Sequence, residues 1–208
     1  MKVTRATFPT PAKAATTARL LLRPMTAGDV AEFHFLRTQP EVMIYTATGK
    51  VDIDHDATRV WLNRFIPPND STTFQFAVEE LMNPGVIIGC VGSHIAEPPT
   101  LGYMFRKEYW ARGYATEAVQ GWLEEYWKLP RHEIDLQSTM PENSELQWHG
   151  DVARELILAT IESGNIGSSK VLAKCGFKPT GITEEVEDFR GPAMLVHHYL
   201  ERPNALPQ

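Results

Sequence analysis

Between residues 115 and 127, apolar side chains recur with the period of an α-helix. They stand at relative positions 0, +3, +4, +7, +8, +11 and +12, and they are Ala115, Ala118, Val119, Trp122, Leu123, Tyr126 and Trp127. A helix with such a wide apolar face must pack against another layer of structure. Leu129-Pro130 marks its end, because proline cannot continue a helix.

The segments on either side of this helix follow other periods. Alternation predicts strands at 74–79, 86–92 and 101–106, with a turn at Asn83-Pro84-Gly85. A strand is also predicted at 19–23, and helices at 26–37 and 54–65. After the long helix we expect a strand at 156–161, a short helix ended by Gly176, and a hairpin from 177–184 and 193–199. This order predicts one mixed α/β domain.

The ends and one internal segment do not share this regularity. Residues 1–18 are rich in Thr, Ala and Pro and predict an extended arm before a domain at 19–202. Residues 131–151 are polar and lack a clear period, so we interpret about 130–151 as an irregular insertion. Residues 203–208 form a tail. The aromatic cluster of Trp110, Trp122, Tyr126 and Trp127 is expected in the core.

Charge and cysteine content narrow the class of partner. Residues 1–28 hold five bases and no acid, so the remaining chain has 15 bases against 26 acids, a net charge of −11. An acidic body disfavours nucleic acid and favours a cationic molecule or a basic peptide, although ordinary solubilising charge explains it equally well. Cys90 and Cys175 suggest no disulfide framework. We therefore expect a cytoplasmic protein without a membrane segment.

The loop before the long helix has the features of an anion site. The first amides of a helix lack partners and carry a partial positive charge. Gly113 permits close approach of an anion, and Arg112 and Thr116 add a cation and a hydroxyl. The sequence thus predicts a phosphate cradle, with the alternative that Gly113 merely turns the chain.

A second strand end leads into the shorter helix. Asn165 and Ser168 stand at its start, where they could face the same opening as the first loop. Without further context, these two residues are most often a turn residue and a helix cap.

Taken together, these motifs resemble the GNAT superfamily of acyl-coenzyme A-dependent acetyltransferases, and its ribosomal-protein N-terminal acetyltransferase-like branch most closely. The resemblance covers residues 19–200 and rests on Arg19-Leu20-Leu21-Leu22-Arg23-Pro24, Gly102-Tyr103, Arg112-Gly113-Tyr114-Ala115-Thr116-Glu117-Ala118, Asn165, Ser168, Val171-Leu172 and Gly176-Phe177. Two departures are Trp110, where the family loop usually has Gln or Arg, and the insertion, which lies on the side that usually borders the acceptor.

The resemblance implies a splayed, mostly antiparallel sheet flanked by helices, with acetyl-CoA as cosubstrate and no metal. Ser168 would act near the thiolate and Asn165 would position the pantetheine arm or a water. The amide of Met104 or Phe105 would bond the thioester oxygen. The residues expected to bind the coenzyme are Met104, Phe105, Arg106, Arg112, Gly113, Tyr114, Ala115, Thr116, Asn165 and Ser168.

The expected reaction is direct attack of an amine, from a small molecule or a protein N-terminus, on the thioester. An alkylamine has a pKa of about 10.4, so a base should help. Candidates are His94, Glu97 and Glu79. The pair His197-His198 is unsuited to one metal, because adjacent strand residues face opposite sides.

Two questions stay open at this stage. The alternative function is a catalytically silent module that binds CoA structurally and a protein partner through its surface. The chain is expected to be a monomer or a homodimer.

Overall fold

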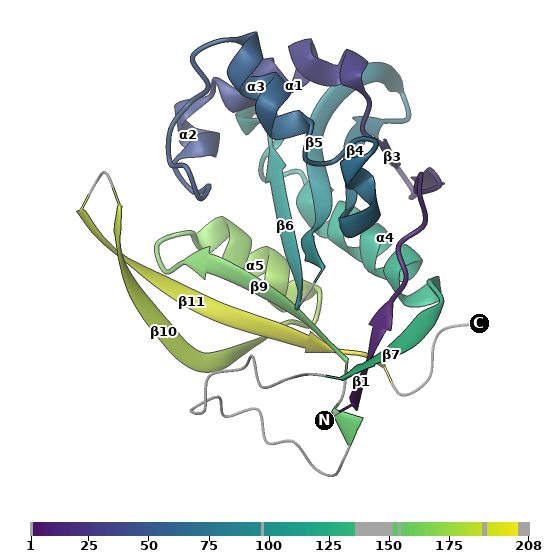
Figure 1. Ribbon diagram of the computed structural model, residues 1–208. Helices are drawn as coiled ribbons and strands as arrows, with labels where there is room; N and C mark the ends of the chain where they lie inside the picture. Colours follow the sequence, from purple (N-terminus) through teal and green to yellow (C-terminus); the bar gives the residue numbers. More distant parts are fainter. Residues whose placement is uncertain (1, 97, 136–151, 154, 189–190, 204–208) are drawn as a thin grey trace.

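In the described part of the chain, eight strands form the central sheet of the computed structural model (Figure 1). The described residues are 2–96, 98–135, 152–153, 155–188 and 191–203. The strand order is β10-β11-β9-β6-β5-β4-β3-β2. The strands are β2 Ala15–Thr16, β3 Leu20–Pro24, β4 Phe74–Glu80, β5 Asn83–Ala96, β6 Pro99–Phe105, β9 Leu156–Glu162, β10 Lys178–Asp188 and β11 Gly191–Glu201.

Neighbouring strands pair antiparallel except for β6 and β9, which are parallel. Among the described residues, one register pair joins them, Thr100 with Leu158. Beyond it β6 stays paired with β5 while β9 turns away with β11, and the two strands fan apart in Figure 1. We call the opening between them the split, and its start at Thr100 and Leu158 the throat. The expected splayed, mostly antiparallel sheet is confirmed.

One face of the sheet is covered by α4 (Tyr114–Lys128) and α5 (Ile166–Lys174). Trp122 and Tyr126 are fully buried there, and Trp122 Nε1 donates to the Phe74 carbonyl at 2.8 Å. The predicted long helix and its core role are thereby confirmed. Trp110 is instead 42% exposed and donates from Nε1 to the Phe105 carbonyl. Its expected core position was wrong because it precedes the helix and does not share its apolar face.

The opposite face carries α1 (Val30–Arg37) and α3 (His55–Leu62), and we call it the α1 face. Asp54 caps α3, since its Oδ1 accepts from Ala57 N at 2.8 Å. Between these helices lies α2 (Pro40–Met43), which is too short to leave a periodic signal in the sequence. The short 3₁₀ turns are η1 Ala27–Asp29, η2 Asn69–Thr72 and η3 Lys107–Tyr109.

The N-terminal arm forms part of a second, smaller sheet. Its strand β1 (Lys2–Ala6) pairs antiparallel with β7 (Arg131–Asp135) and parallel with β8 (Val152–Ala153). The irregular structure expected at 131–151 was therefore wrong for its first five residues. β7 is a strand without apolar alternation, because its His132 and Glu133 are exposed. The rest of the predicted insertion, 136–151, lies outside the described residues.

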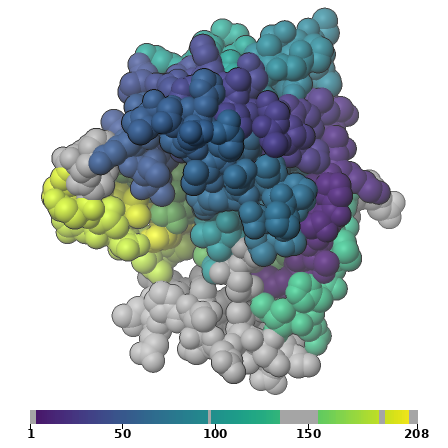
Figure 2. Space-filling model, turned by 45° about the horizontal axis from the view of Figure 1, so that its top comes forward, coloured from purple at the N-terminus to yellow at the C-terminus, as the bar shows by residue number. Residues whose placement is uncertain are grey.

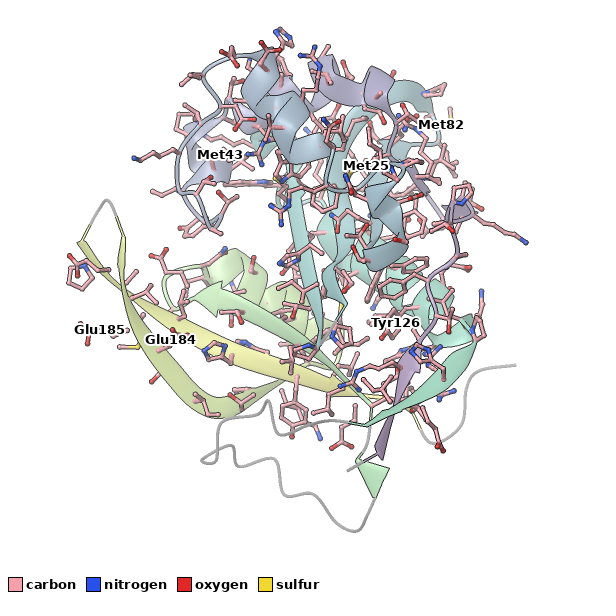
Figure 3. All side chains as sticks on the ribbon, in the orientation of Figure 1. Met25, Met43, Met82, Tyr126, Glu184 and Glu185 are labelled. Atoms are coloured by element: carbon pink, nitrogen blue, oxygen red, sulfur yellow. The ribbon has the colours of Figure 1, made fainter. Side chains whose placement is uncertain are left out.

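The turn between β4 and β5 lies earlier than predicted. Glu80 pairs with Asn83, so Leu81-Met82 forms the turn, and Met82 is exposed (Figure 3). The predicted turn residue Gly85, at φ +87°, lies inside β5 beside a register shift. Glu79 stabilises this irregular part of β5, because its Oε2 accepts from Gly85 N at 2.7 Å.

None of the helices in the described ranges is long and apolar enough to span a bilayer.

The end of α5 follows the prediction closely. Gly176 adopts φ +85°, Phe177 N donates to Leu172 O at 3.0 Å, and Gly176 N donates to Ala173 O at 3.2 Å. These two bonds make a Schellman motif, which favours glycine at this position. The chain then enters the hairpin of β10 and β11. β10 continues four residues beyond the predicted segment 177–184, and β11 extends beyond 193–199 at both ends.

Candidate functional site

Two helix N-termini lie at the split because each follows one of its parallel strands. The chain passes from β6 through η3 into α4, and from β9 through a short turn into α5. In open α/β sheets, ligands bind beyond the carboxyl ends of parallel strands where these part, and β6 and β9 are such a parallel pair. The topology therefore brings together the two motifs found in the sequence.

The start of α4 has the geometry expected of a phosphate cradle. Gly113 is the N-cap at φ +82°, and no side chain caps the helix. The first helical bond runs from Glu117 N to Gly113 O, so the amides of Tyr114, Ala115 and Thr116 precede it. These amides and the helix dipole together favour an anion.

Gly113 is required by its backbone conformation. A Cβ placed there would meet no atom of the described residues closer than Arg19 Nη2, at 3.5 Å. A positive φ is nevertheless costly for residues with a Cβ, and most costly for β-branched ones. A bulkier residue would also occupy the space in front of the cradle.

The cradle is supported by an ion pair between Arg19, which immediately precedes β3, and Glu117 of α4. Arg19 Nε donates to Glu117 Oε2 at 2.7 Å, and Arg19 Nη1 donates to the Arg112 carbonyl at 3.2 Å. The Arg19 guanidinium also lies 4.4 Å from the centre of the Tyr114 ring. Burial acts to raise the pKa of Glu117, but hydrogen bonds from Thr17 and Arg19 outweigh it, and the pKa is lowered. Glu117 is thus held as a carboxylate neutralised by Arg19.

The two arginines expected at the coenzyme have different positions. Arg112 is exposed and stacks over the Tyr109 ring at 5.5 Å, so it can reach an anion at the cradle. Arg106 is buried, its amide donates to Ile88 O at 2.9 Å, and its Nη2 donates to Glu32 Oε2 at 2.8 Å. The Arg106 amide and side chain are therefore directed to β5 and α1 rather than into the split.

The backbone of β6 presents its amides alternately to the two sides. Because the Arg106 amide faces β5, that of Met104 faces β5 as well, whereas those of Tyr103 and Phe105 face the split. The Phe105 carbonyl confirms this orientation, since it accepts from Trp110 Nε1 at 2.7 Å. Of the two amides expected to bond the thioester oxygen, the geometry favours that of Phe105.

At the start of α5, Asn165 and Ser168 interact directly. Asn165 Oδ1 accepts from Ser168 N at 3.0 Å, so Asn165 is the cap of this helix. Ser168 is half-buried, and within the described residues its hydroxyl has no hydrogen bond. Tyr103 crosses from β6 and donates its hydroxyl to the Ser168 carbonyl at 3.3 Å. Burial raises the pKa of Tyr103 to about 12, so its phenol is protonated at neutral pH.

The expected base residues lie in three different environments. His94 packs on the α1 face, its Nδ1 3.1 Å from a Cβ built on Gly102. Glu79 is buried and bonded to Arg23 Nε at 2.6 Å, so it holds the far side of the sheet together. Glu97 lies outside the described residues. Of these, His94 alone is shown beside the split.

The sequence did not single out Tyr103, Arg19 or Glu117 for a role at the site. A tyrosine on an otherwise apolar strand face is a usable signal, because a buried hydroxyl needs a partner. The pairing of Arg19 with Glu117 joins residues 98 positions apart, and nothing local reveals it.

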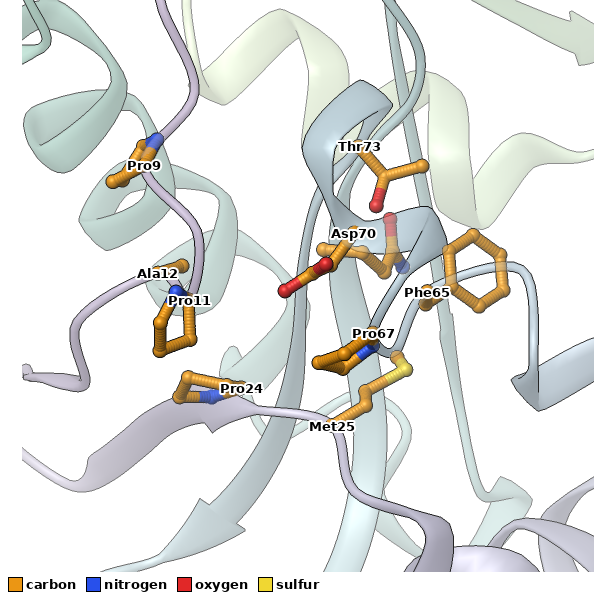
Figure 4. A pocket seen from close by; sticks show the side chains of 10 residues that line it. Pro9, Pro11, Ala12, Pro24, Met25, Phe65, Pro67, Asp70 and Thr73 are labelled. Carbon is orange, nitrogen blue, oxygen red and sulfur yellow. The ribbon is translucent and has the colours of Figure 1, made fainter.

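A separate cavity of about 30 Å³ lies between the N-terminal arm and η2 (Figure 4). Its polar lining comes from Asp70, Thr73 and Gln75, and prolines from the arm and β3 close it. It has room for about one water molecule. The strand order separates β4, which carries Gln75, from the split by β5 and β6, so this cavity is not part of the site.

Comparison with known proteins gives a family and a fold. The model of the acetyltransferase (GNAT) domain matches residues 19–178. None of the curated proteins compared with this chain matches it.

Similar solved structures include a GNAT family acetyltransferase from Bacillus anthracis, with TM-score 0.67 and 21% identity over 91% of this chain and 98% of that one. RimL, a ribosomal L7/L12 α-N-protein acetyltransferase in complex with coenzyme A, has TM-score 0.69 and 13% identity over 90% and 96%. Spermidine N-acetyltransferase from Vibrio cholerae, in complex with CoA and spermine, has TM-score 0.64 and 18% identity over 89% and 97%. These similarities establish the shared fold.

Proposed function

Since the chain belongs to the GNAT acetyltransferase family, we propose that it transfers the acetyl group of acetyl-CoA to an amine of a small molecule or of a protein N-terminus. One observation carries the proposal. The uncapped N-terminus of α4, the outward amides of Tyr103 and Phe105 on β6, and Ser168, which Tyr103 contacts, belong to the elements that border the split. A module that bound CoA for structure alone would have no chemical need for the hydroxyl.

The residues present fit the coenzyme. The amides of Tyr114, Ala115 and Thr116 would hold the pyrophosphate, with Arg112 adding a charge-assisted bond. The amides of Tyr103 and Phe105 would align the pantetheine arm along the open side of β6. Asn165 contributes by fixing the start of α5, and thereby the position of Ser168.

Bound acetyl-CoA supplies an activated acyl group as a thioester. We assign the Phe105 N–H to donate to the carbonyl oxygen, where negative charge would develop during attack. The Ser168 hydroxyl is the group that we assign to donate a proton to the departing sulfur. Tyr103 holds the Ser168 backbone while its own phenol stays protonated, so we assign it a positioning role.

The acceptor is expected on the α1 face, opposite α5. The named neighbours act on a ribosomal protein and on spermidine, which are both amine acceptors. The acidic body of this chain, −11 over residues 29–208, favours a cationic amine. In the space-filling view the blue surface of residues 40–70 borders the yellow hairpin of β10 and β11 (Figure 2). We place the reaction in the cytoplasm, in keeping with the two free cysteines.

The first test is thermal unfolding with and without acetyl-CoA. A ligand at about 100 times its Kd adds about 2.7 kcal/mol to native stability, which raises Tm by about 5 to 11 °C in a chain of this size. Acetyl transfer is then measured with alkyl diamines, polyamines and short peptides with free N-termini. Release of free thiol must depend on the added amine.

Two results would contradict the proposal. An unchanged Tm at millimolar acetyl-CoA would contradict the proposal that this chain binds the coenzyme. A raised Tm with no transfer to any amine of the panel would favour the catalytically silent module.

A further inference from the structure

Two histidines flank the throat on the α1 face. Gly102 and Thr160 each stand two residues beyond the pair Thr100 and Leu158, at the first positions where β6 and β9 part. His94 packs against Gly102, and His197 Nδ1 lies 3.0 Å from Thr160 Oγ1. The Ile157 and Ala159 side chains pack into the core on the α4 face, so the Thr160 side chain must point to the α1 face.

The surroundings of the two imidazoles differ in charge. His94 is half-buried, and burial together with the nearby cation of Arg64 lowers the pKa of His94. Its protonated form is therefore disfavoured. His197 is 28% exposed, and its Nε2 lies 3.4 Å from Glu184 Oε2 on β10. A carboxylate at this position provides a negative charge that attracts an ammonium group to the Nε2 side of the ring.

Resting on the proposed function, the geometry points to His197 as the base that takes a proton from the acceptor amine. Thr160 orients the ring through Nδ1, and Glu184 attracts the ammonium group to the Nε2 side. The backbone of His197 is also held, because Thr180 Oγ1 donates to its carbonyl at 3.1 Å. The class of ligand is a primary alkylammonium.

The proton balance is complete without another reactant. The ammonium passes one proton to His197 Nε2, and the neutral nitrogen attacks the acyl carbon. The bond from carbon to sulfur breaks, and the sulfur keeps the electron pair and takes a proton from Ser168, which recovers one from solvent. The amine nitrogen loses its second proton to solvent water as the amide forms, and His197 releases its proton to water, so the net product is one proton in solution.

The first experiment compares His197→Gln with wild type over a range of pH, using the best acceptor of the amine panel. Loss of a general base lowers kcat by about 10²- to 10⁴-fold, and we expect the acidic limb of the kcat profile to disappear. The deficit should shrink as the pH approaches about 10, where an alkylamine loses its proton unaided. A merely structural histidine would lower kcat equally at every pH.

The matched control is His132→Gln. His132 on β7 makes a similar contact, with Nδ1 2.9 Å from Thr7 Oγ1, but it belongs to the smaller sheet and not to the strands that border the split. We expect it to leave kcat and the pH profile unchanged. His94→Gln should retain the acidic limb. A kcat for His197→Gln equal to wild type, or loss of the limb in His94→Gln alone, would overturn the assignment.

A second readout needs no turnover. Binding of 1,4-diaminobutane to the full chain is measured by calorimetry for wild type, Glu184→Gln and Glu185→Gln, the two residues labelled on the hairpin in Figure 3. Adjacent strand residues face opposite sides, so Glu184→Gln should weaken binding by about twofold to fivefold and Glu185→Gln should not.

The two readouts separate the two proposals. Equal affinity in all three proteins, or no binding to wild type at millimolar diamine, would overturn the amine site. Failure of the whole amine panel with selective loss in Glu184→Gln would instead contradict the proposed transfer and leave the amine site supported.

Discussion

The two helices that begin at the split differ in how their first turns are completed. At α4 the N-cap is Gly113, without a side chain, and the first amides are open. At α5 the N-cap is Asn165, whose Oδ1 takes the Ser168 amide at 3.0 Å. The N-termini of α4 and α5 therefore differ in whether their first amides are free to bind a ligand. The α4 terminus is available to an anion, whereas the α5 terminus is satisfied internally and presents a hydroxyl.

We propose that the N-cap residue of each helix separates coenzyme binding, at α4, from proton transfer, at α5. An asparagine at α4 would compete with the anion for the amides. A glycine at α5 would leave the first turn less well defined, and with it the position of Ser168. The predictions below test this division, beginning with the largest expected effect.

Gly113→Val should raise the Kd for acetyl-CoA at least tenfold, equivalent to about 1.4 kcal/mol. Valine at φ +82° strains the cradle and places methyl groups in front of its amides. Calorimetric titration measures the change. Gly85→Val is the control, since Gly85 has φ +87° with nothing within 4 Å of its added Cβ. It should lose comparable stability and keep the Kd; an unaltered Kd in Gly113→Val would reject the cradle.

Ser168→Ala should lower kcat by about tenfold to a hundredfold, within the lower part of the range for acid–base catalysis. The KM for acetyl-CoA should change little, because the hydroxyl is not expected to contact the pyrophosphate. Steady-state kinetics with both substrates varied will separate the two constants. Ser169→Ala, one residue further along α5, should behave as wild type. Equal kcat in both variants would exclude Ser168 from proton transfer.

Asn165→Ala should lower the stability by about 1 kcal/mol, the usual effect of losing an N-cap, and Tm by about 2 to 4 °C. Asp54→Ala removes the analogous cap of α3, where Asp54 Oδ1 accepts from Ala57 N, and should cost a similar amount. The two variants should differ in kcat, which should fall in Asn165→Ala and stay unchanged in Asp54→Ala. If both caps lower Tm and neither lowers kcat, Asn165 is a cap without influence on Ser168.

Arg19→Ala should have the smallest effect, a loss of less than about 1 kcal/mol, because the pair with Glu117 is partly exposed. The sign of its pH dependence is defined. The pKa of Glu117 is lowered in the folded protein, so its contribution is present at neutral pH and lost as the pH falls through that pKa. The Tm difference from wild type should therefore narrow in acid. A difference that widens there would contradict the ion pair.

Much of the fold follows from local patterns. The apolar repeat of 115–127 determined α4, and Gly176 determined the end of α5. The patterns failed where a segment is stabilised from a distance. β7 lacks alternation and exists because β1 pairs with it across more than 120 residues. Trp110 is exposed because it precedes α4 and lies off the apolar face of that helix.

The candidate site divides in the same way. Gly113, Arg112, Asn165 and Ser168 were identified by residue type and position, because the start of a helix has local chemical requirements. Met104 and Phe105 could not be distinguished, since the sequence does not say which amide faces a neighbouring strand. From the sequence, His197 was discussed only as a possible metal ligand. Nothing near it in the sequence indicates that Thr160 and Glu184 are its partners.

The sequence by itself determined the family, the two helix N-termini and the residues that stand on them. The tertiary structure alone decided where the sheet splits, which strand amides face the opening, and which histidine meets a carboxylate. The physical reason is the sequence distance over which each kind of interaction acts. Capping and periodicity act over a few residues, whereas the register of β6 with β9 and of β9 with β11 depends on how distant segments pack.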